Sequence, residues 1–122
     1  MAKRILIADD EPNIVVSLEF LMQKMGHVVR VANTGEDALS AVGEFKPDLI
    51  LLDIMMPRMS GFDLCQSVRE NPAWKGIKIV MLSARGREID VTKGMAVGAD
   101  AYVTKPFSTR DLVAKVRELL GE

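Results

Sequence analysis

The stretch ILIADDEP, residues 5–12, sets an apolar run directly against three acids, Asp9, Asp10 and Glu11. An uninterrupted apolar run is typical of a strand that is buried on both faces. Carboxylates crowded at the end of such a strand repel one another unless a cation lies among them. The stretch therefore predicts a buried strand and a polar site at its end.

Short apolar runs alternate along the chain with longer segments of helical period. The short runs predict strands at RILIA (4–8), HVVRVA (27–32), DLILLD (48–53), KIVMLS (78–83) and AYVTK (101–105). The first, third and fourth runs are almost entirely apolar, so helices must cover both faces of the sheet, which favours parallel strands. Strands and helices that alternate in this way predict a doubly wound α/β sandwich.

The helices are predicted from apolar residues that recur every three or four positions. They are expected from Pro12 to Gly26, over 34–45, over 61–70, roughly over 86–97, and from Ser108 through Leu120. Thr34 with Asp37, and Ser108 with Asp111, have the spacing of a capping box at two helix starts. The fourth segment contains β-branched residues and Gly94, so it is expected to be the least rigid helix.

Composition excludes several classes of protein. The 122 residues suit one domain, 1–122, and 16 Lys and Arg against 17 Asp and Glu give a net charge of -1. Without a basic excess, direct binding to nucleic acid or to a membrane is not expected. One cysteine and no signal-peptide or membrane-spanning run predict a cytoplasmic location. The lone His27 is expected at the surface or at a strand edge.

Polar side chains follow four of the expected strands. Asp9 and Asp10 follow the first, Asp53 the third, Ser83 the fourth and Lys105 the fifth. The carboxyl ends of parallel strands meet at one edge, where doubly wound sheets bind their ligands. Oxygen ligands without His or Cys favour a hard cation, so Mg²⁺ is expected here, with Mn²⁺ as an alternative.

The same residues suit phosphoryl chemistry at Asp53. A carboxylate can accept a phosphoryl group, and the transfer needs mainly positioning and neutralisation of charge on the phosphoryl oxygens. A metal ion and Lys105 would supply the neutralisation, and Ser83 a hydrogen bond. Taken singly, these residues also have structural interpretations as helix caps, turn residues or solvated charges. We favour a site because they converge at one edge.

Four motifs, ILIADDEP, DLILLDIMMPRMSGFDLC, IVMLSARG and GADAYVTKPF, closely resemble the receiver domain of bacterial two-component response regulators, and chemotaxis regulators in particular. The resemblance covers essentially the whole chain. It implies a flavodoxin-like (βα)5 three-layer sandwich, whose parallel five-stranded sheet has the order 2-1-3-4-5. It also implies a signalling domain that catalyses only its own phosphorylation and dephosphorylation, rather than an enzyme.

The resemblance assigns roles to the residues at the acidic edge. It implies that Asp53 is the phosphoacceptor, and that Asp10 and Asp53 ligate Mg²⁺ together with the backbone carbonyl of Met55. Asp9 is implied to help through a water molecule.

Further residues are implied to sense the phosphoryl group. Lys105 is implied to pair with it, and Ser83 to move and hydrogen-bond it. Tyr102 resembles the aromatic residue that swings inward together with Ser83. The Lys105–Pro106 bond resembles the family's cis peptide, a bond type essentially confined to proline.

The resemblance also implies partners. A sensor histidine kinase or a phosphotransfer protein would supply the phosphoryl group, and an output domain or protein would bind the face formed by 86–97, 101–105 and the last helix. Apolar Val91, Ala96 and Ala101 on this face argue against a charge-paired dimer and favour a more apolar partner contact. A monomer or weak dimer is expected before phosphorylation.

Three rival functions are weighed against this one. The first is a haloacid-dehalogenase-like phosphatase, a class that is expected to carry a D-x-D pattern after its first strand. Here Asp53 is followed by IMMP, which does not match that pattern. A nucleotide-binding module would need G-x-G-x-x-G or G-x-x-x-x-G-K-[ST], and the sequence contains neither. A purely structural adaptor of receiver type is expected to lack a site residue, and all of them are present.

Overall fold

The computed structural model describes residues 2–56, 59–84 and 88–122. Its strands form one parallel sheet in the order β2-β1-β3-β4-β5, which is the predicted flavodoxin-like topology. The strands are β1 (Arg4–Ala8), β2 (Val28–Ala32), β3 (Leu49–Asp53), β4 (Lys78–Ala84) and β5 (Ala101–Lys105). The helices are α1 (Pro12–Lys24), α2 (Gly35–Phe45), α3 (Gly61–Glu70), α4 (Glu88–Ala96) and α5 (Thr109–Leu120), with a short 3₁₀ helix η1 (Pro72–Trp74) that the sequence did not predict.

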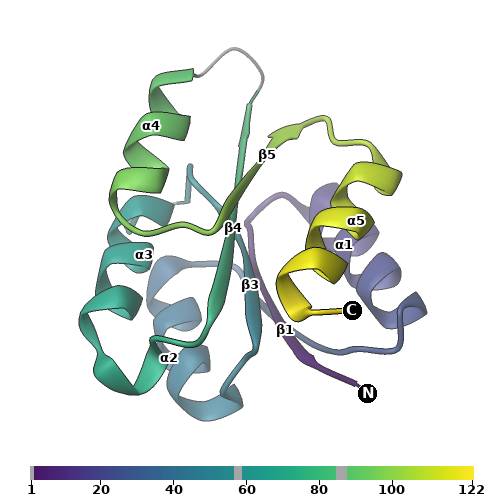
Figure 1. Cartoon of the computed structure of the whole chain (residues 1–122), viewed down its shortest axis with the longest axis horizontal. Coiled ribbons are helices and arrows are strands. Elements are labelled where there is room, and N and C mark those ends of the chain that lie inside the picture. Colours follow the sequence, from purple (N-terminus) through teal and green to yellow (C-terminus); the bar gives the residue numbers. More distant parts are fainter. Residues whose placement is uncertain (1, 57–58, 85–87) are drawn as a thin grey trace.

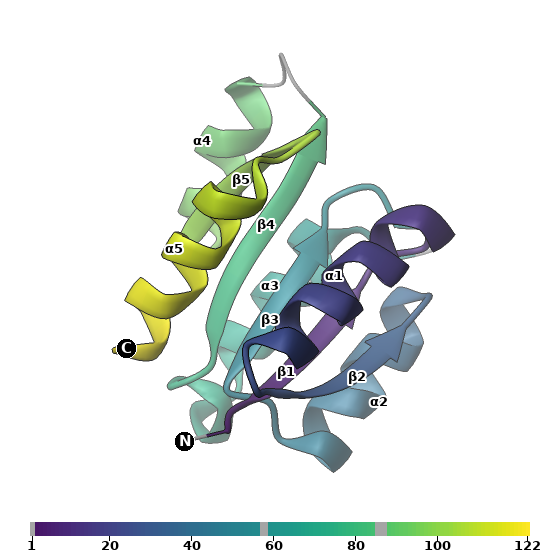
Figure 2. The same ribbon diagram turned by 90° about the vertical axis from the view of Figure 1, so that its right-hand side faces the viewer.

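The sheet is the middle of three layers, as predicted. Helices α1 and α5 cover one face, and α2, α3 and α4 cover the other (Figures 1 and 2). Because neighbouring side chains of a strand point to opposite faces, each buried strand contributes to two cores. In β1, for example, Ile5 and Ile7 pack with α1 and α5, whereas Leu6 packs with α2 and α3.

The starts of α2, α3 and α5 are fixed by side chains that accept hydrogen bonds from the first turn. Thr34 accepts one from the Asp37 amide and Ser108 from the Asp111 amide, as the capping spacing predicts. Ser60 caps α3 in the same way, a contact that was not predicted. For α4, positions 86–87 of the predicted helix lie outside the described residues.

His27 is buried, so the expectation of a surface position is wrong, although it does lie next to an edge strand of the sheet, β2. It is only 6% exposed, just before β2, and its Nδ1 atom accepts a hydrogen bond from the Lys3 amide (3.2 Å). Its Nε2 atom is buried without a hydrogen-bond partner among the described residues. The N-terminal segment that covers it comes from 24 residues earlier in the sequence.

Arg69 of α3 links three segments near the amino ends of β4 and β5, at the opposite end of the strands from the site. Its guanidinium donates to the carbonyls of Gly98 (2.8 Å) and Ile77 (2.7 Å) and to the Asp100 carboxylate (2.7 Å). Asp100 in turn accepts from the Ile79 amide (2.8 Å). The C-terminal end of α4 is thus held to α3 and to the beginnings of β4 and β5.

None of the helices in the described ranges is long and apolar enough to cross a membrane.

We expect Arg69→Lys to lower the free energy of unfolding by about 2 kcal/mol, because an ammonium cannot reach three partners held by a planar fork. Urea unfolding of the purified protein measures the change. Arg30→Lys is the matched control, since Arg30 forms a largely exposed pair with Glu44 and its loss should change stability by less than about 1 kcal/mol. Equal losses in the two variants would contradict the anchoring role of Arg69.

Candidate functional site

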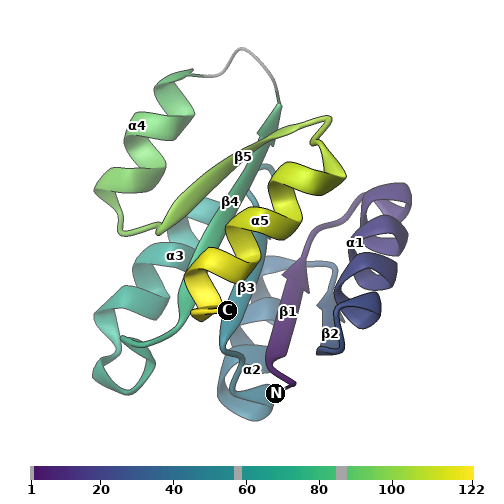
Figure 3. The same ribbon diagram turned by 45° about the vertical axis from the view of Figure 1, so that its right-hand side comes forward.

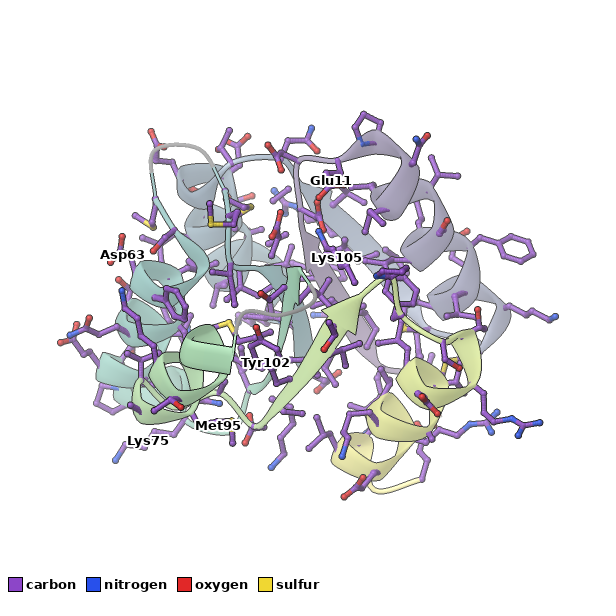
Figure 4. All side chains as sticks on the ribbon, turned by 90° about the horizontal axis from the view of Figure 1, so that it is seen from above. Glu11, Asp63, Lys75, Met95, Tyr102 and Lys105 are labelled. Atoms are coloured by element: carbon purple, nitrogen blue, oxygen red, sulfur yellow. The ribbon has the colours of Figure 1, made fainter. Side chains whose placement is uncertain are left out.

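The carboxyl ends of the strands bring the predicted site residues to one edge of the sheet. Asp9 directly follows β1, Asp53 ends β3, Ser83 is the next-to-last residue of β4 and Lys105 ends β5. The strands run parallel toward this edge in Figure 3, and Figure 4 looks down on it. The convergence that the sequence predicted is therefore present in the fold.

Three carboxylates gather at the centre of this edge. One oxygen from each of Asp9, Asp10 and Asp53 lies within 4.8 Å of the others. Asp9 and Asp53 are buried, whereas Asp10 is exposed. The cluster is therefore open to solvent on one side and enclosed by the sheet on the other. Oxygen ligands of this kind fit a hard divalent cation.

Backbone amides hold the two buried carboxylates in place. The Glu11 amide donates to Asp9 Oδ1 (2.9 Å), and the Met55 amide donates to Asp53 Oδ1 (3.0 Å). Gly61 keeps the loop after β3 close beneath the site, since a Cβ atom there would lie 2.5 Å from the Asp53 carbonyl oxygen. The orientation of Asp53 thus depends on contacts that only a tightly folded loop provides.

Lys105 brings a positive charge among these acids. Its Nζ atom donates to Asp9 Oδ2 (2.9 Å) and to Glu11 Oε1 (3.0 Å), and lies 3.6 Å from Asp53 Oδ2. Burial alone would lower the pKa of this ammonium, but the hydrogen bonds to Asp9 and Glu11 outweigh it, so the pKa is raised. The contact between Glu11 and Lys105 was not predicted, because the only sequence signal of Glu11 is its place beside the aspartate pair.

Among the acids that the structure describes, Asp53 is the one whose ionisation is clearly perturbed. Its pKa is raised from 3.8 to about 6, chiefly because the carboxyl is buried and in smaller part because of the charges of Asp9 and Asp10. The Met55 amide and the Lys105 ammonium act in the opposite direction. Asp53 is therefore a carboxylate held at some energetic cost, which a cation nearby would relieve.

The remaining predicted residues lie around this centre. Ser83 is buried beside the site on β4, and Tyr102 on β5 is half-buried against the core that α2 and α3 share. The Lys105–Pro106 peptide bond is cis, as the resemblance implied. Met55, two residues after Asp53, is exposed, and the metal contact expected of its carbonyl stays a prediction.

We expect Asp53→Asn to raise the free energy of unfolding of the metal-free protein by about 1–3 kcal/mol near neutral pH. The folded state disfavours the ionised carboxyl, so wild type loses stability as the pH rises from 3.8 to about 6, while the variant does not. Urea unfolding in a chelator across this range measures the difference, which should vanish at the acid end. Glu19→Gln removes a charge outside the site and controls for net charge; the same pH profile in wild type and Asp53→Asn would contradict the interpretation.

Two solved structures that are similar to this chain share its fold over nearly their whole length. A candidate response regulator from Chloroflexus aurantiacus is 34% identical, with a TM-score of 0.96 and coverage of 100% of both chains. The chemotaxis response regulator CheY4 of Vibrio cholerae is 28% identical, with a TM-score of 0.91 and coverage of 98% of this chain and 99% of the other.

A third structure is more distant in sequence. The receiver domain of the sensor histidine kinase PA1611 from Pseudomonas aeruginosa, with magnesium in its active site cleft, is 22% identical, has a TM-score of 0.90 and is covered fully in both directions. At this identity the likeness concerns the fold. The family model for the response regulator receiver domain matches residues 5–117. This chain belongs to the family of response regulator receiver domains.

Proposed function

We propose that Asp53 accepts a phosphoryl group from the phosphohistidine of a sensor histidine kinase or a phosphotransfer protein. One observation carries the proposal, namely that the carboxylates of Asp9, Asp10 and Asp53 meet the Lys105 ammonium at one edge of the sheet. Receiver domains are phosphoacceptors of two-component systems and interact with histidine kinases and output domains. A cytoplasmic location, a monomer or weak dimer, and the absence of nucleic-acid binding stay predictions.

The oxygen cluster fits Mg²⁺, with Mn²⁺ as an alternative. Asp10, Asp53 and the Met55 carbonyl would hold the ion, and Asp9 would contribute through water. When bound, it would neutralise charge on the phosphoryl oxygens. The magnesium in the active site cleft of the PA1611 receiver domain, which has the same fold, supports this assignment.

The protein's own residues position the groups that react. A carboxylate oxygen of Asp53 attacks phosphorus, the phosphorus–nitrogen bond of the phosphohistidine breaks, and the imidazole leaves with the electron pair. Lys105, 3.6 Å from Asp53 Oδ2, is near enough to contact an oxygen of the new phosphoryl group. Ser83, buried on the neighbouring strand, would offer its hydroxyl to another. The domain thereby modifies itself and does not turn over a separate substrate.

The phosphoryl group would also change the face built from α4, β5 and α5. It adds nearly two negative charges, which favour a new arrangement of Ser83 and, after it, of Tyr102 on β5. Met95 and Ala96 of α4 are exposed on this face, with Met95 labelled in Figure 4. Ala101 is buried and takes no part in the surface, and the side chain of Val91 lies outside the described residues. An apolar output contact would therefore centre on α4.

The donor would approach over α1, which runs beside the site. Val16 and Phe20, one helical turn apart, are 65% and 66% exposed, and Val16 lines a groove that reaches Asp10. Large exposed apolar side chains next to a reactive centre indicate a surface that a protein partner covers. A helix that carries the donor histidine could bury Phe20 while it presents its phosphoryl group to Asp53.

We expect wild type to gain a phosphoryl group from a small-molecule donor such as acetyl phosphate in Mg²⁺, and Asp53→Asn to gain none. Without the carboxylate there is no acceptor, and without the cation the negative charges of donor and site repel. Intact-mass spectrometry with Mg²⁺ and with a chelator measures the adduct. If wild type stays unlabelled under conditions that label a known receiver, the phosphoacceptor function is wrong and the adaptor interpretation replaces it.

We expect Phe20→Asn to slow transfer from a phosphorylated histidine kinase about tenfold or more, since loss of one buried aromatic anchor typically weakens an interface by over about 1.4 kcal/mol. The rate with acetyl phosphate should stay within about twofold, because that donor needs no docking surface. Val28→Asn, at an exposed position remote from the site, is the control. Equal slowing with both donors would show damage to the site instead of a docking role.

A further inference from the structure

The Lys105 ammonium is bound more closely by Glu11 than by the proposed phosphoacceptor. Its Nζ atom lies 3.0 Å from Glu11 Oε1 but 3.6 Å from Asp53 Oδ2, which is beyond hydrogen-bond distance. Figure 4 shows the Glu11 and Lys105 side chains facing each other above the sheet edge. The ammonium is therefore within ion-pair distance of Asp53, but the hydrogen bonds that hold it go to Asp9 and Glu11.

Glu11 occupies a helix position that usually has a different task. It is the N-cap residue of α1, where a side-chain oxygen normally accepts a hydrogen bond from the first turn. Glu11 makes no such bond. Its carboxylate instead accepts a hydrogen bond from Lys105, which lies 94 residues later in the sequence. The side chain is thus committed to the site and not to the helix.

The two acids that hold Lys105 differ in how easily they can release it. Asp9 is fully buried, so the loss of Lys105 would leave a charge without water around it. Glu11 is 59% exposed, and water can replace the ammonium there at little cost. If Asp53 gains negative charge and attracts Lys105, the contact of Lys105 with Glu11 would therefore break more easily than its contact with Asp9.

We propose that Glu11 is a positioning residue that holds Lys105 away from Asp53 in the unphosphorylated domain and thereby slows phosphorylation. This inference rests on the proposed phosphoacceptor function. Phosphorylation would break the Glu11–Lys105 contact, and Lys105 would turn to the phosphoryl oxygens. Glu11 thus raises the barrier to activation without touching the reacting atoms.

Two substitutions of Glu11 distinguish the effect of its charge from the effect of holding Lys105 in place. Glu11→Gln removes the charge and weakens the contact, whereas Glu11→Asp keeps the charge but is one methylene too short to hold Lys105 in the same place. Glu19→Gln removes an acid from the same helix outside the site. Thermal unfolding verifies that all variants fold, since Glu11 is largely exposed.

The first measurement needs no phosphate. The ¹H–¹⁵N signal of the Lys105 ammonium, assigned by its loss in Lys105→Arg, reports the hydrogen bonds of Nζ. Both Glu11 variants should shift this signal or speed its exchange with water, whereas Glu19→Gln should leave it unchanged. An unchanged signal in both Glu11 variants would overturn the inference, whatever the domain does with phosphate.

The second measurement is the rate of phosphorylation by phosphoramidate or acetyl phosphate, with the apparent affinity for beryllofluoride alongside. Both Glu11 variants should react about two- to fivefold faster and bind beryllofluoride correspondingly more tightly, because an exposed ion pair contributes little more. A faster rate in Glu11→Gln alone would assign the effect to charge and overturn the positioning role. If wild type itself takes no phosphoryl group, the proposed function fails, and the inferred role in phosphorylation is overturned with it, although the Lys105 signal can still show the restraint.

Discussion

Two carboxylates buried at one edge of the sheet, Asp9 and Asp53, are the constraint on which the rest of the structure depends. Burial disfavours the ionised form of Asp53, and the nearby charges of Asp9 and Asp10 add repulsion. Each receives one backbone amide, and both lie near the same ammonium of Lys105. These contacts leave more negative than positive charge at the centre, which is the condition under which a site attracts a cation.

The parallel sheet supplies the geometry that this charge arrangement needs. Since β1, β3, β4 and β5 run in one direction, their last residues face the same solvent edge while helices cover both faces of the sheet. The reactive groups therefore stand on strands that are held from both sides. Gly61, the first residue of α3, fits closely against this edge, because any side chain there would meet the Asp53 backbone.

The strands and most helix ends could be predicted because they depend on local patterns. Uninterrupted apolar runs mark the strands, and Thr34 and Ser108 mark helix starts by capping chemistry. The features that escaped prediction depend on distant contacts or on short segments. The 3₁₀ helix Pro72–Trp74 is too short to show a period. His27 is buried because the chain around Lys3 folds over it, and a single histidine gives no sequence signal of that.

The site followed from the sequence to the extent that topology alone determines it. A parallel sheet necessarily brings Asp9, Asp53 and Lys105 to one edge, so their convergence could be predicted. The hydrogen bond from Lys105 to Glu11 could not be predicted, because these two residues meet only where the chain segments after β1 and at the end of β5 come together.

The hydrogen bonds of Lys105 to Asp9 and Glu11 lie at the end of β5, a strand that also reaches the core under α2 and α3. Lys105 ends the strand on which Tyr102 lies three residues earlier, and Tyr102 packs with the core on the side of α2 and α3. If the proposed phosphorylation draws Lys105 toward Asp53, the change begins at the end of β5, a strand that lies against α4. We therefore expect the contact between Lys105 and the exposed Glu11 to influence how readily phosphorylation at this edge alters that face.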